Sequence, residues 1–331
     1  MLLLLTSSLL VIVVLANEVT LAQAKKKKPL SSSSSLSHHS TTTITTPNAS
    51  TSNTLNAFQQ SQQQSQSLLP YEDKNQQGTI FNGLNNGSKV VIITFGDGLE
   101  SQYLYAKPIL DKYGFKANFF VTCNKVGLMD SKITWQELAQ LYNEGHVIGS
   151  KTMNYGTKAM QNKDLNHLSA NDLEYEVGQS KQCLLDHGIN TTVFAVPKNV
   201  ASDNETVVNT ISKYYDFAIN GHSNLTDLHA NRYSIGEYSM QHIRDNGSTS
   251  YDNSQMFSQF VAVVNSQNEF NKDGVINAIP VIGYHEIIPA YTDVSYTNKS
   301  SDIPLDLFEA EMKYLHDNDF RVITFYDLGP K

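Results

Sequence analysis

The feature that most constrains the fold is a regular alternation of predicted strands and helices that begins at Lys89. The stretch KVVIITF (Lys89–Phe95) is short, apolar and β-branched and ends at a glycine turn, which is typical of a buried strand. Further strands are predicted at 117–123, 146–150, 191–196, 216–220, 275–284 and 320–325, with helices at 101–113, 134–143, 170–187, 205–215, 251–266 and 305–318. Alternation of this kind predicts parallel strands with helices outside, and about seven repeats favour a distorted (β/α) barrel over an open doubly wound sheet. Pro280 makes the strand at 275–284 an edge or irregular one.

The first 78 residues have a different composition. Residues 1–15 are almost purely apolar, a run shorter than the roughly 20 residues of a membrane-spanning helix. Ala22-Gln23-Ala24 supplies a small-x-small cleavage pattern, and four lysines follow it. We therefore expect a signal peptide or N-terminal anchor at 1–24, a disordered Ser/Thr/Gln-rich linker at 25–78 and a folded domain at 79–331. The protein is then secreted or held at the cell surface, with membrane contact only through its N-terminal segment.

Charge and cysteine content narrow the classes of function. The net charge of −8 argues against nucleic acid as the main partner, and no glycine-rich phosphate fingerprint follows any predicted strand. Two cysteines, Cys123 and Cys183, allow either one disulfide or two inert core thiols. Asn-x-Ser/Thr sequons fit an exported protein and begin at Asn48, Asn86, Asn190, Asn204, Asn224, Asn246 and Asn298.

Chemically useful side chains are expected at the C-terminal ends of the strands, because parallel α/β folds place their sites there. The first such end reads TFGDG (Thr94–Gly98), in which Asp97 follows a glycine, Gly96. Three later strand ends read SKTMNY (Ser150–Tyr155), FAVP (Phe194–Pro197) and IGYHE (Ile282–Glu286).

These stretches, in this order, resemble the polysaccharide deacetylase family, which is the NodB-homology domain of carbohydrate esterase family 4. The resemblance covers Lys89 to about Leu328 and includes YGFKANFFVT (Tyr113–Thr122), EGHVIGS (Glu144–Ser150) and EMKYLHDNDFRVITFYDL (Glu311–Leu328). It implies a distorted barrel that removes acetyl groups from the N-acetyl sugars of a cell-surface or envelope polysaccharide. It also implies a divalent metal, usually zinc, held by one Asp and two His, with a second Asp as base and a late His as acid.

The residues at the family's base and metal positions depart from that pattern. The opening motif Thr-Phe-Asp-Asp-Gly has Gly96 at the position of the base, and it keeps the metal-ligand Asp as Asp97. The motif His-Ser/Thr-x-x-His supplies both imidazole ligands in the family. Here it reads KTMNY, so Lys151 and Tyr155 replace the two histidines.

The substrate-binding and acid positions are retained only in part. The family's Arg two residues before a proline is Ala195, ahead of Pro197. The late His matches as His285, with Tyr284 before it at a substrate-binding position. The family's fourth motif has an Asp that orients the late His, and its position stays open between Asp216 and Asp227.

These changes predict that no metal is bound, because catalytic zinc normally has three protein ligands. Lys151 is then expected to pair with Asp97, since an unpaired buried carboxylate costs several kcal/mol, and Tyr155 to donate its hydroxyl to the same cluster. The alternative is that both side chains turn into solvent. His146, at the start of a strand, is expected to be a packed or surface histidine.

A rewired metal site is the other alternative. Zinc or another divalent metal would then use Asp97 and His285 together with further ligands. The candidates for added ligands or a substitute base are His222, His242, Glu100 and Glu286.

Three functions from different classes remain open at this stage. The first is an extracellular pseudoenzyme that binds an N-acetylated glycan without hydrolysing it. The second is an active deacetylase that cleaves the acetamide C–N bond through a non-standard site. The third is an envelope scaffold that binds protein partners. The missing motif residues favour the first, and the sequence leaves the oligomeric state open.

Overall fold

The computed structural model describes residues 89–155, 157, 160, 163–201, 203–221, 225–227, 231–241, 253–272, 275–289 and 301–330, which belong to one compact unit. The predicted export segment, the linker, the domain boundaries at 24 and 78, and the candidates His222 and His242 lie outside these residues. Within the described ranges, no helix is both long and apolar enough to cross a membrane.

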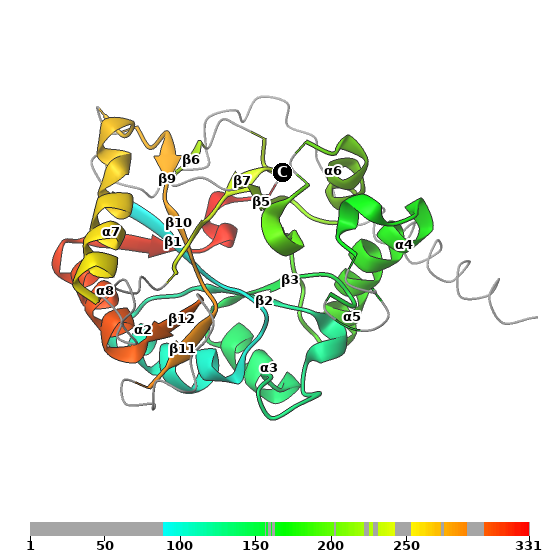
Figure 1. The fold of residues 1–331 in the computed structure, drawn as a ribbon, viewed down its shortest axis with the longest axis horizontal. Helices are drawn as coiled ribbons and strands as arrows, with labels where there is room; N and C mark the ends of the chain where they lie inside the picture. The colour runs from blue at the N-terminus through cyan, green and yellow to red at the C-terminus, as the bar shows by residue number, and fades with distance from the viewer. Residues whose placement is uncertain are drawn as a thin grey trace, which may run out of the picture. The chain divides into compact units, whose positions relative to one another are not determined.

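A parallel sheet forms the centre of the unit, with helices around it (Figure 1). All seven predicted strands are present, as β1 (Lys89–Phe95), β2 (Asn118–Val121), β3 (Val147–Ser150), β4 (Val193–Ala195), β5 (Phe217–Gly221), β10 (Val281–Tyr284) and β13 (Phe320–Ile323). Two very short strands, β7 (Ile235–Gly236) and β8 (Tyr238–Ser239), complete the order β7-β5-β4-β3-β2-β1-β10-β8. β13 pairs with the first half of β1, where Ile92 has Ile323 on one side and Val281 on the other.

The two strands at the ends of this order are neighbours in the sequence. β7 pairs with β5, β8 pairs with β10, and a single residue, Glu237, separates them. The sheet is therefore nearly closed by one short segment, and the expectation of a distorted barrel is confirmed. β7 and β8 were not predicted because runs of two residues carry no recognisable strand pattern.

The helices follow the predicted positions with two local differences. They are α2 (Lys107–Tyr113), α3 (Trp135–Asn143), α4 (Ala170–Glu174), α5 (Ser180–Asp186), α6 (Glu205–Ser212), α7 (Asn253–Asn265) and α8 (Leu305–Asp317). A π-helical turn at Gln102–Ala106 precedes α2, and another at Tyr175–Gln179 joins α4 to α5. π-helical turns are often associated with functional sites.

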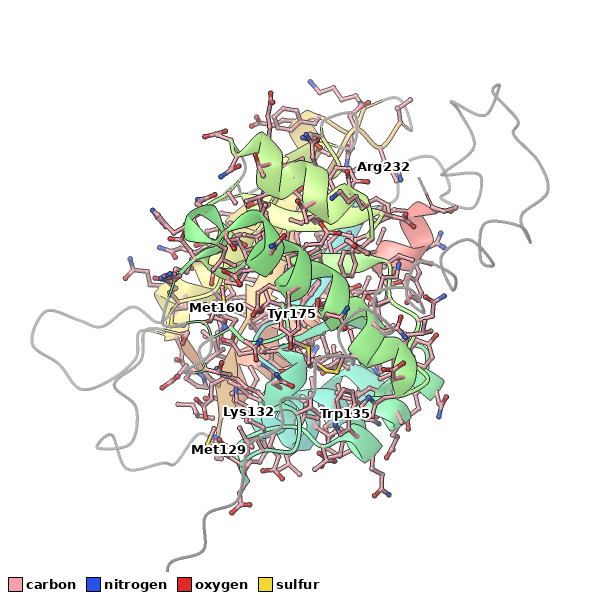
Figure 2. The ribbon with its side chains drawn as sticks, turned by 90° about the vertical axis from the view of Figure 1, so that its right-hand side faces the viewer. Met129, Lys132, Trp135, Met160, Tyr175 and Arg232 are labelled. Atoms are coloured by element: carbon pink, nitrogen blue, oxygen red, sulfur yellow. A yellow bond between two sulfur atoms is a disulfide. The ribbon has the colours of Figure 1, made fainter. Side chains whose placement is uncertain are left out.

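The structure answers two questions that the sequence left open, namely the place of the strand that contains Pro280 and the state of the two cysteines. Pro280 divides the predicted strand into β9 (Ala278–Ile279) and β10, so the strand is irregular, but β10 lies between β1 and β8 and is not an edge. Cys123 and Cys183 form a disulfide between the turn after β2 and α5, which Figure 2 shows as a yellow bond. Two further small sheets pair β6 (Thr226–Asp227) with β9 and β11 (Glu286–Ile288) with β12 (Asp302–Pro304).

Alternation along the strands decides which side chains face the barrel interior. On β1, Val90 and Ile92 belong to the interior cluster, whereas Val91, Ile93 and Phe95 pack against the surrounding helices. The same period of two applies to the other strands, since successive side chains point to opposite faces. The interior cluster consists of Val90, Ile92, Phe120, Val147, Val193, Ala195, Phe217, Ile219, Ile235, Ile276, Ile279, Val281, Ile323, Phe325 and Leu328.

Candidate functional site

The C-terminal end of the barrel carries the candidate site. Continuing the interior face of each strand by two-residue steps leads from Ile92 to Gly96, from Val147 to Lys151, from Val281 to His285 and from Ile235 to Glu237. These four residues, together with Ala195 at the end of β4, line one small cavity of 170 Å³. The predicted site positions therefore meet at one end of the sheet.

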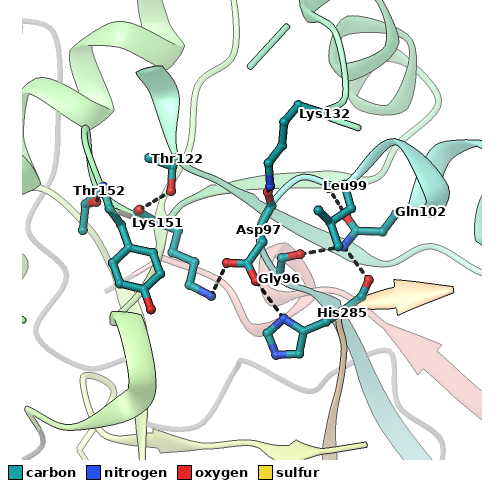
Figure 3. Close-up of polar contacts among 10 residues, drawn as sticks. Gly96, Asp97, Leu99, Gln102, Thr122, Lys132, Lys151, Thr152 and His285 are labelled. Atoms are coloured by element: carbon teal, nitrogen blue, oxygen red, sulfur yellow. Dashed lines mark hydrogen bonds and ion pairs between the residues drawn. The ribbon is translucent and has the colours of Figure 1, made fainter. Parts of the chain in front are cut away.

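Asp97 is the centre of the polar network (Figure 3). Its Oδ1 accepts a hydrogen bond from Lys151 Nζ at 2.8 Å, and its Oδ2 lies 3.0 Å from His285 Nδ1. Its backbone carbonyl accepts from Lys132 Nζ at 2.8 Å. The predicted ion pair between Lys151 and Asp97 is confirmed, and the alternative in which Lys151 turns into solvent is wrong.

The backbone at Asp97 adopts a strained conformation. Its φ of 72° lies in the left-handed region, which non-glycine residues rarely adopt. Thr152 after β3 and Lys198 after β4 show the same feature, with φ of 69° and 64°. Such strain costs of order 1–3 kcal/mol at each residue and persists where the surrounding structure holds it. Three strand-end loops around the site are therefore held in costly conformations.

The charges at Asp97 and Lys151 stabilise each other. Burial acts to raise the pKa of Asp97, but the Lys151 ammonium and the His285 contact outweigh it and hold that pKa well below its ordinary value. Burial acts to lower the pKa of Lys151, but Asp97, and after it Glu237, hold that pKa above its ordinary value. Both groups are therefore charged at neutral pH.

His285 occupies the space that a side chain at position 96 would need. A Cβ built on Gly96 would lie 2.9 Å from both Cε1 and Nδ1 of the imidazole and 3.5 Å from Lys151 Nζ. Cβ atoms essentially never approach other atoms to less than 3.0 Å. The glycine at the family's base position is therefore coupled to the placement of His285 against Asp97.

Tyr155 contacts the cluster through its ring. Lys151 Nζ lies 5.6 Å and Lys125 Nζ 5.8 Å from the ring centroid, which is within the range of cation–π attraction. The expected donation of its hydroxyl to the Lys151–Asp97 cluster is not among the contacts found for the described residues. The loop is fixed from below by the buried Glu176, whose two carboxylate oxygens accept from the backbone and side-chain nitrogens of Asn154, each at 2.8 Å.

Gln102 fixes the two loops that carry Gly96 and His285. It is fully buried, and its Nε2 donates to the carbonyls of Gly96 at 2.5 Å and His285 at 2.8 Å. Gln102 lies in the π-helical turn before α2, a context that sequence reasoning did not anticipate. It is a positioning residue, because removing it would leave both carbonyls without this shared donor.

Glu237 is a site residue that sequence reasoning missed. Its Oε1 accepts from Thr94 Oγ1 at 2.5 Å, and its carboxylate fills the space above Gly283. It lies on the interior face because Ile235, Glu237 and Ser239 alternate along the barrel-closing segment, which is defined by pairing with β5 and β10 and by no pattern in the sequence.

Tyr284 is among the residues that line the smaller cavity. Its side chain is 1% exposed, its ring packs between Phe95 and Phe308, and its hydroxyl donates to Glu311 Oε2 at 2.7 Å. Its hydroxyl is therefore engaged within the core, and its substrate-binding role stays a prediction.

Some of the remaining candidate residues line the cavities at the site, and others lie elsewhere in the fold. Ala195 lines the smaller cavity, and Pro197 is buried at the start of the turn that carries Lys198 to the cavity wall. Glu286 lines a larger cavity of 340 Å³, whereas Glu100 is not among the described residues that line either cavity. Asp216, a candidate for the family's fourth motif, lines a separate cavity with Tyr326. Its position therefore does not support assigning it to that motif.

His146 is a packed histidine, as expected. It is 1% exposed, its Nδ1 accepts from Ala117 N at 3.2 Å, and burial lowers its pKa to about 4. Within the described residues it belongs to the one His and carboxylate group with metal-like spacing, together with Asp111 and Glu144. Because Nδ1 faces an N–H donor, a metal at Nε2 would require an imidazolate, and Lys107 already pairs with both carboxylates.

The arrangement at Asp97 does not fit a zinc ion. Both carboxylate oxygens already accept from nitrogen donors, and the Lys151 ammonium lies where it would repel a divalent cation. A lysine ligates a metal only when deprotonated, and the pKa of Lys151 is raised. The two imidazoles of the family pattern are absent at positions 151 and 155.

Comparison with known proteins supports the family resemblance. Residues 83–214, which are less than half of the chain, match the family model described as polysaccharide deacetylase. A curated relative, "Putative polysaccharide deacetylase YxkH" of Bacillus subtilis (strain 168), is 31% identical over 111 residues. That match covers 33% of this chain and 37% of the relative, so it spans little more than a third of the relative's length.

Solved structures match this chain at low sequence identity. The Xyl-CE4 domain of a multidomain xylanase from the hindgut metagenome of Trinervitermes trinervoides is 17% identical, with 73% of this chain and 89% of that chain covered and a TM-score of 0.45. Peptidoglycan deacetylase PdaC from Bacillus subtilis is 16% identical, with 73% and 90% covered and a TM-score of 0.42. Similarity at this level says nothing about what this chain binds.

Proposed function

We propose that this protein is a glycan-binding pseudoenzyme, in which the Lys151 ammonium takes the place of the catalytic metal. The observation that carries the proposal is the pair of contacts at Asp97, to Lys151 at 2.8 Å and to His285 at 3.0 Å. They neutralise the one retained ligand position of the family. The barrel mouth keeps its cavities, so binding does not depend on the lost metal chemistry.

The proposed ligand is a cell-surface or envelope polysaccharide that contains N-acetyl sugars. The family description and the name of the curated relative support a polysaccharide, and PdaC is named a peptidoglycan deacetylase. The apolar N-terminal segment with its Ala-x-Ala pattern supports export, so we propose a secreted or cell-surface location.

The first test is zinc stoichiometry on the purified full chain after incubation with zinc and removal of the excess. We expect no retained zinc in the wild type. The double variant K151H/Y155H is the matched control, because it restores the family's two imidazoles beside Asp97, and we expect it to retain zinc. About one zinc per wild-type chain would overturn the proposal and point to a rewired site.

A second candidate function is metal-free deacetylation, which the His285–Asp97 contact favours. A carboxylate that holds Nδ1 leaves Nε2 as the nitrogen for proton transfer, as in other Asp–His pairs. The acetate released from N-acetylchitotetraose by the wild type, compared with His285→Ala, distinguishes the two functions. We expect no difference. Acetate release that depends on His285 would favour the enzyme.

A further inference from the structure

The larger cavity at the barrel mouth is lined by an excess of lysines. Lys125 and Lys132 come from the segment after β2, and Lys198 comes from the turn after β4. The carboxylates on the same wall are Asp97 and Glu286, and Asp97 is already engaged by Lys151 and His285. Since the whole chain carries a net charge of −8, this local excess of positive charge runs against the overall balance.

Lys132 is a buried charge among these lysines. It is 9% exposed, and its ammonium donates at 2.8 Å to a neutral group, the backbone carbonyl of Asp97. Among the described residues, no carboxylate lies within ion-pair distance of it. Burial lowers the pKa of Lys132, and Lys125 and Lys151 lower it further, against the opposing effect of Asp97 and Glu286. A buried ammonium of this kind is stabilised by an anion that enters the cavity.

The geometry of the wall limits what such an anion belongs to. The cavity volume of 340 Å³ is at the lower end of the range for small-ligand sites, which suits about one sugar unit. The ring of Tyr155, flanked by Lys125 and Lys151, forms part of the wall. Figure 3 shows Lys132 and Lys151 approaching Asp97 from different directions, Lys132 at its backbone carbonyl and Lys151 at its carboxylate.

We propose that this cavity binds the carboxylate of an acidic sugar residue in the glycan, with Lys132 and Lys125 as its cationic partners. The inference rests on the proposed glycan-binding function and names the class of glycan. The carboxylate pairs with the two ammonium groups, while the Lys151–Asp97 pair remains closed beneath it. Neutral N-acetylated glycans lack the group that Lys132 would pair with.

The test compares two tetrasaccharides by isothermal titration calorimetry on the full chain at 50 mM NaCl. Hyaluronan tetrasaccharide alternates glucuronate with N-acetylglucosamine, whereas N-acetylchitotetraose has only the neutral sugar. We expect hyaluronan tetrasaccharide to bind at least tenfold more tightly, and this preference to shrink at 300 mM NaCl because salt screens the pairing. Lys132→Met and Lys125→Met should each reduce the preference severalfold. Lys112→Met removes an exposed lysine that pairs with Glu309 and lines neither cavity, and it should not change the preference.

Each other outcome is informative. Equal binding of the two tetrasaccharides, or tighter binding of the neutral one, would overturn this inference and leave the glycan-binding function standing. No binding of either, by wild type and Lys112→Met alike, would overturn both. A preference that survives in folded Lys132→Met and Lys125→Met would mean that the acidic group binds elsewhere.

Discussion

Replacing Lys151 by methionine tests the central contact of the site. The substitution keeps a long unbranched side chain and removes the ammonium that lies 2.8 Å from Asp97. Breaking a buried pair by removing one partner costs about 3–5 kcal/mol, because the other charge is left uncompensated. The Asp97 side chain is 33% exposed and keeps its contact to His285, so we expect a smaller loss of about 2–3 kcal/mol.

Urea unfolding at pH 7 measures this loss. With an m-value of ~2–3 kcal/mol per M, the midpoint of Lys151→Met should fall by about 1 M. Lys112→Met removes an exposed lysine from its pair with Glu309 and should change the midpoint little or not at all. A midpoint for Lys151→Met equal to that of the wild type would refute the reasoning, since Asp97 would then be stable without its partner.

The pH dependence of the same variant has a defined sign. The pKa of Asp97 is lower in the folded protein than in the unfolded chain, so its contribution is present above its ordinary value of 3.8 and is lost as the pH falls below that. Removing the ammonium reduces the shift. The wild type should therefore lose more stability than Lys151→Met between pH 4 and pH 3.

Three further predictions concern other parts of the unit. Gly96→Ala places a Cβ 2.9 Å from the His285 ring, so the imidazole should leave Asp97, with a loss of about 1–2 kcal/mol and a changed imidazole nitrogen-15 spectrum; an unchanged spectrum would contradict the coupling. Burial raises the pKa of Glu311 to about 8, so wild-type stability should fall from pH 5 to pH 8 by up to about 4 kcal/mol, and Glu311→Gln should flatten that fall. Cys183→Ser opens the disulfide to Cys123 across a separation of 60 residues and should lower stability by about 4 kcal/mol in urea unfolding, whereas a loss below about 1 kcal/mol would mean that the bond adds little.

The retained and altered motif positions were recognisable from the sequence because they resemble the family's motifs and each follows a predicted strand. The predicted pairing of Lys151 with Asp97 came from that resemblance, and the structure brings both together with His285. The sequence did not show that the Tyr284 hydroxyl is engaged by Glu311, because that contact joins residues on different elements.

Gln102 and Glu237 could not be predicted from motifs and strand ends. Gln102 acts through two carbonyls that are 183 and 6 residues away in the chain, and no local pattern marks such a donor. Glu237 belongs to a segment whose strands are two residues long, so its interior face is defined only by pairing with β5 and β10.

The sequence by itself determined the elements and the edge at which chemistry would lie. Apolar period, turn residues and strand–helix alternation are local properties, and they predict the parallel barrel and the polar strand ends. Only the tertiary structure decided how the site is neutralised. The 2.8 Å pairing of Lys151 with Asp97, the imidazole in the space above Gly96 and the weakly compensated Lys132 depend on distances between loops far apart in the chain. Electrostatic energies follow those distances and the burial around them, which no spacing in the sequence specifies.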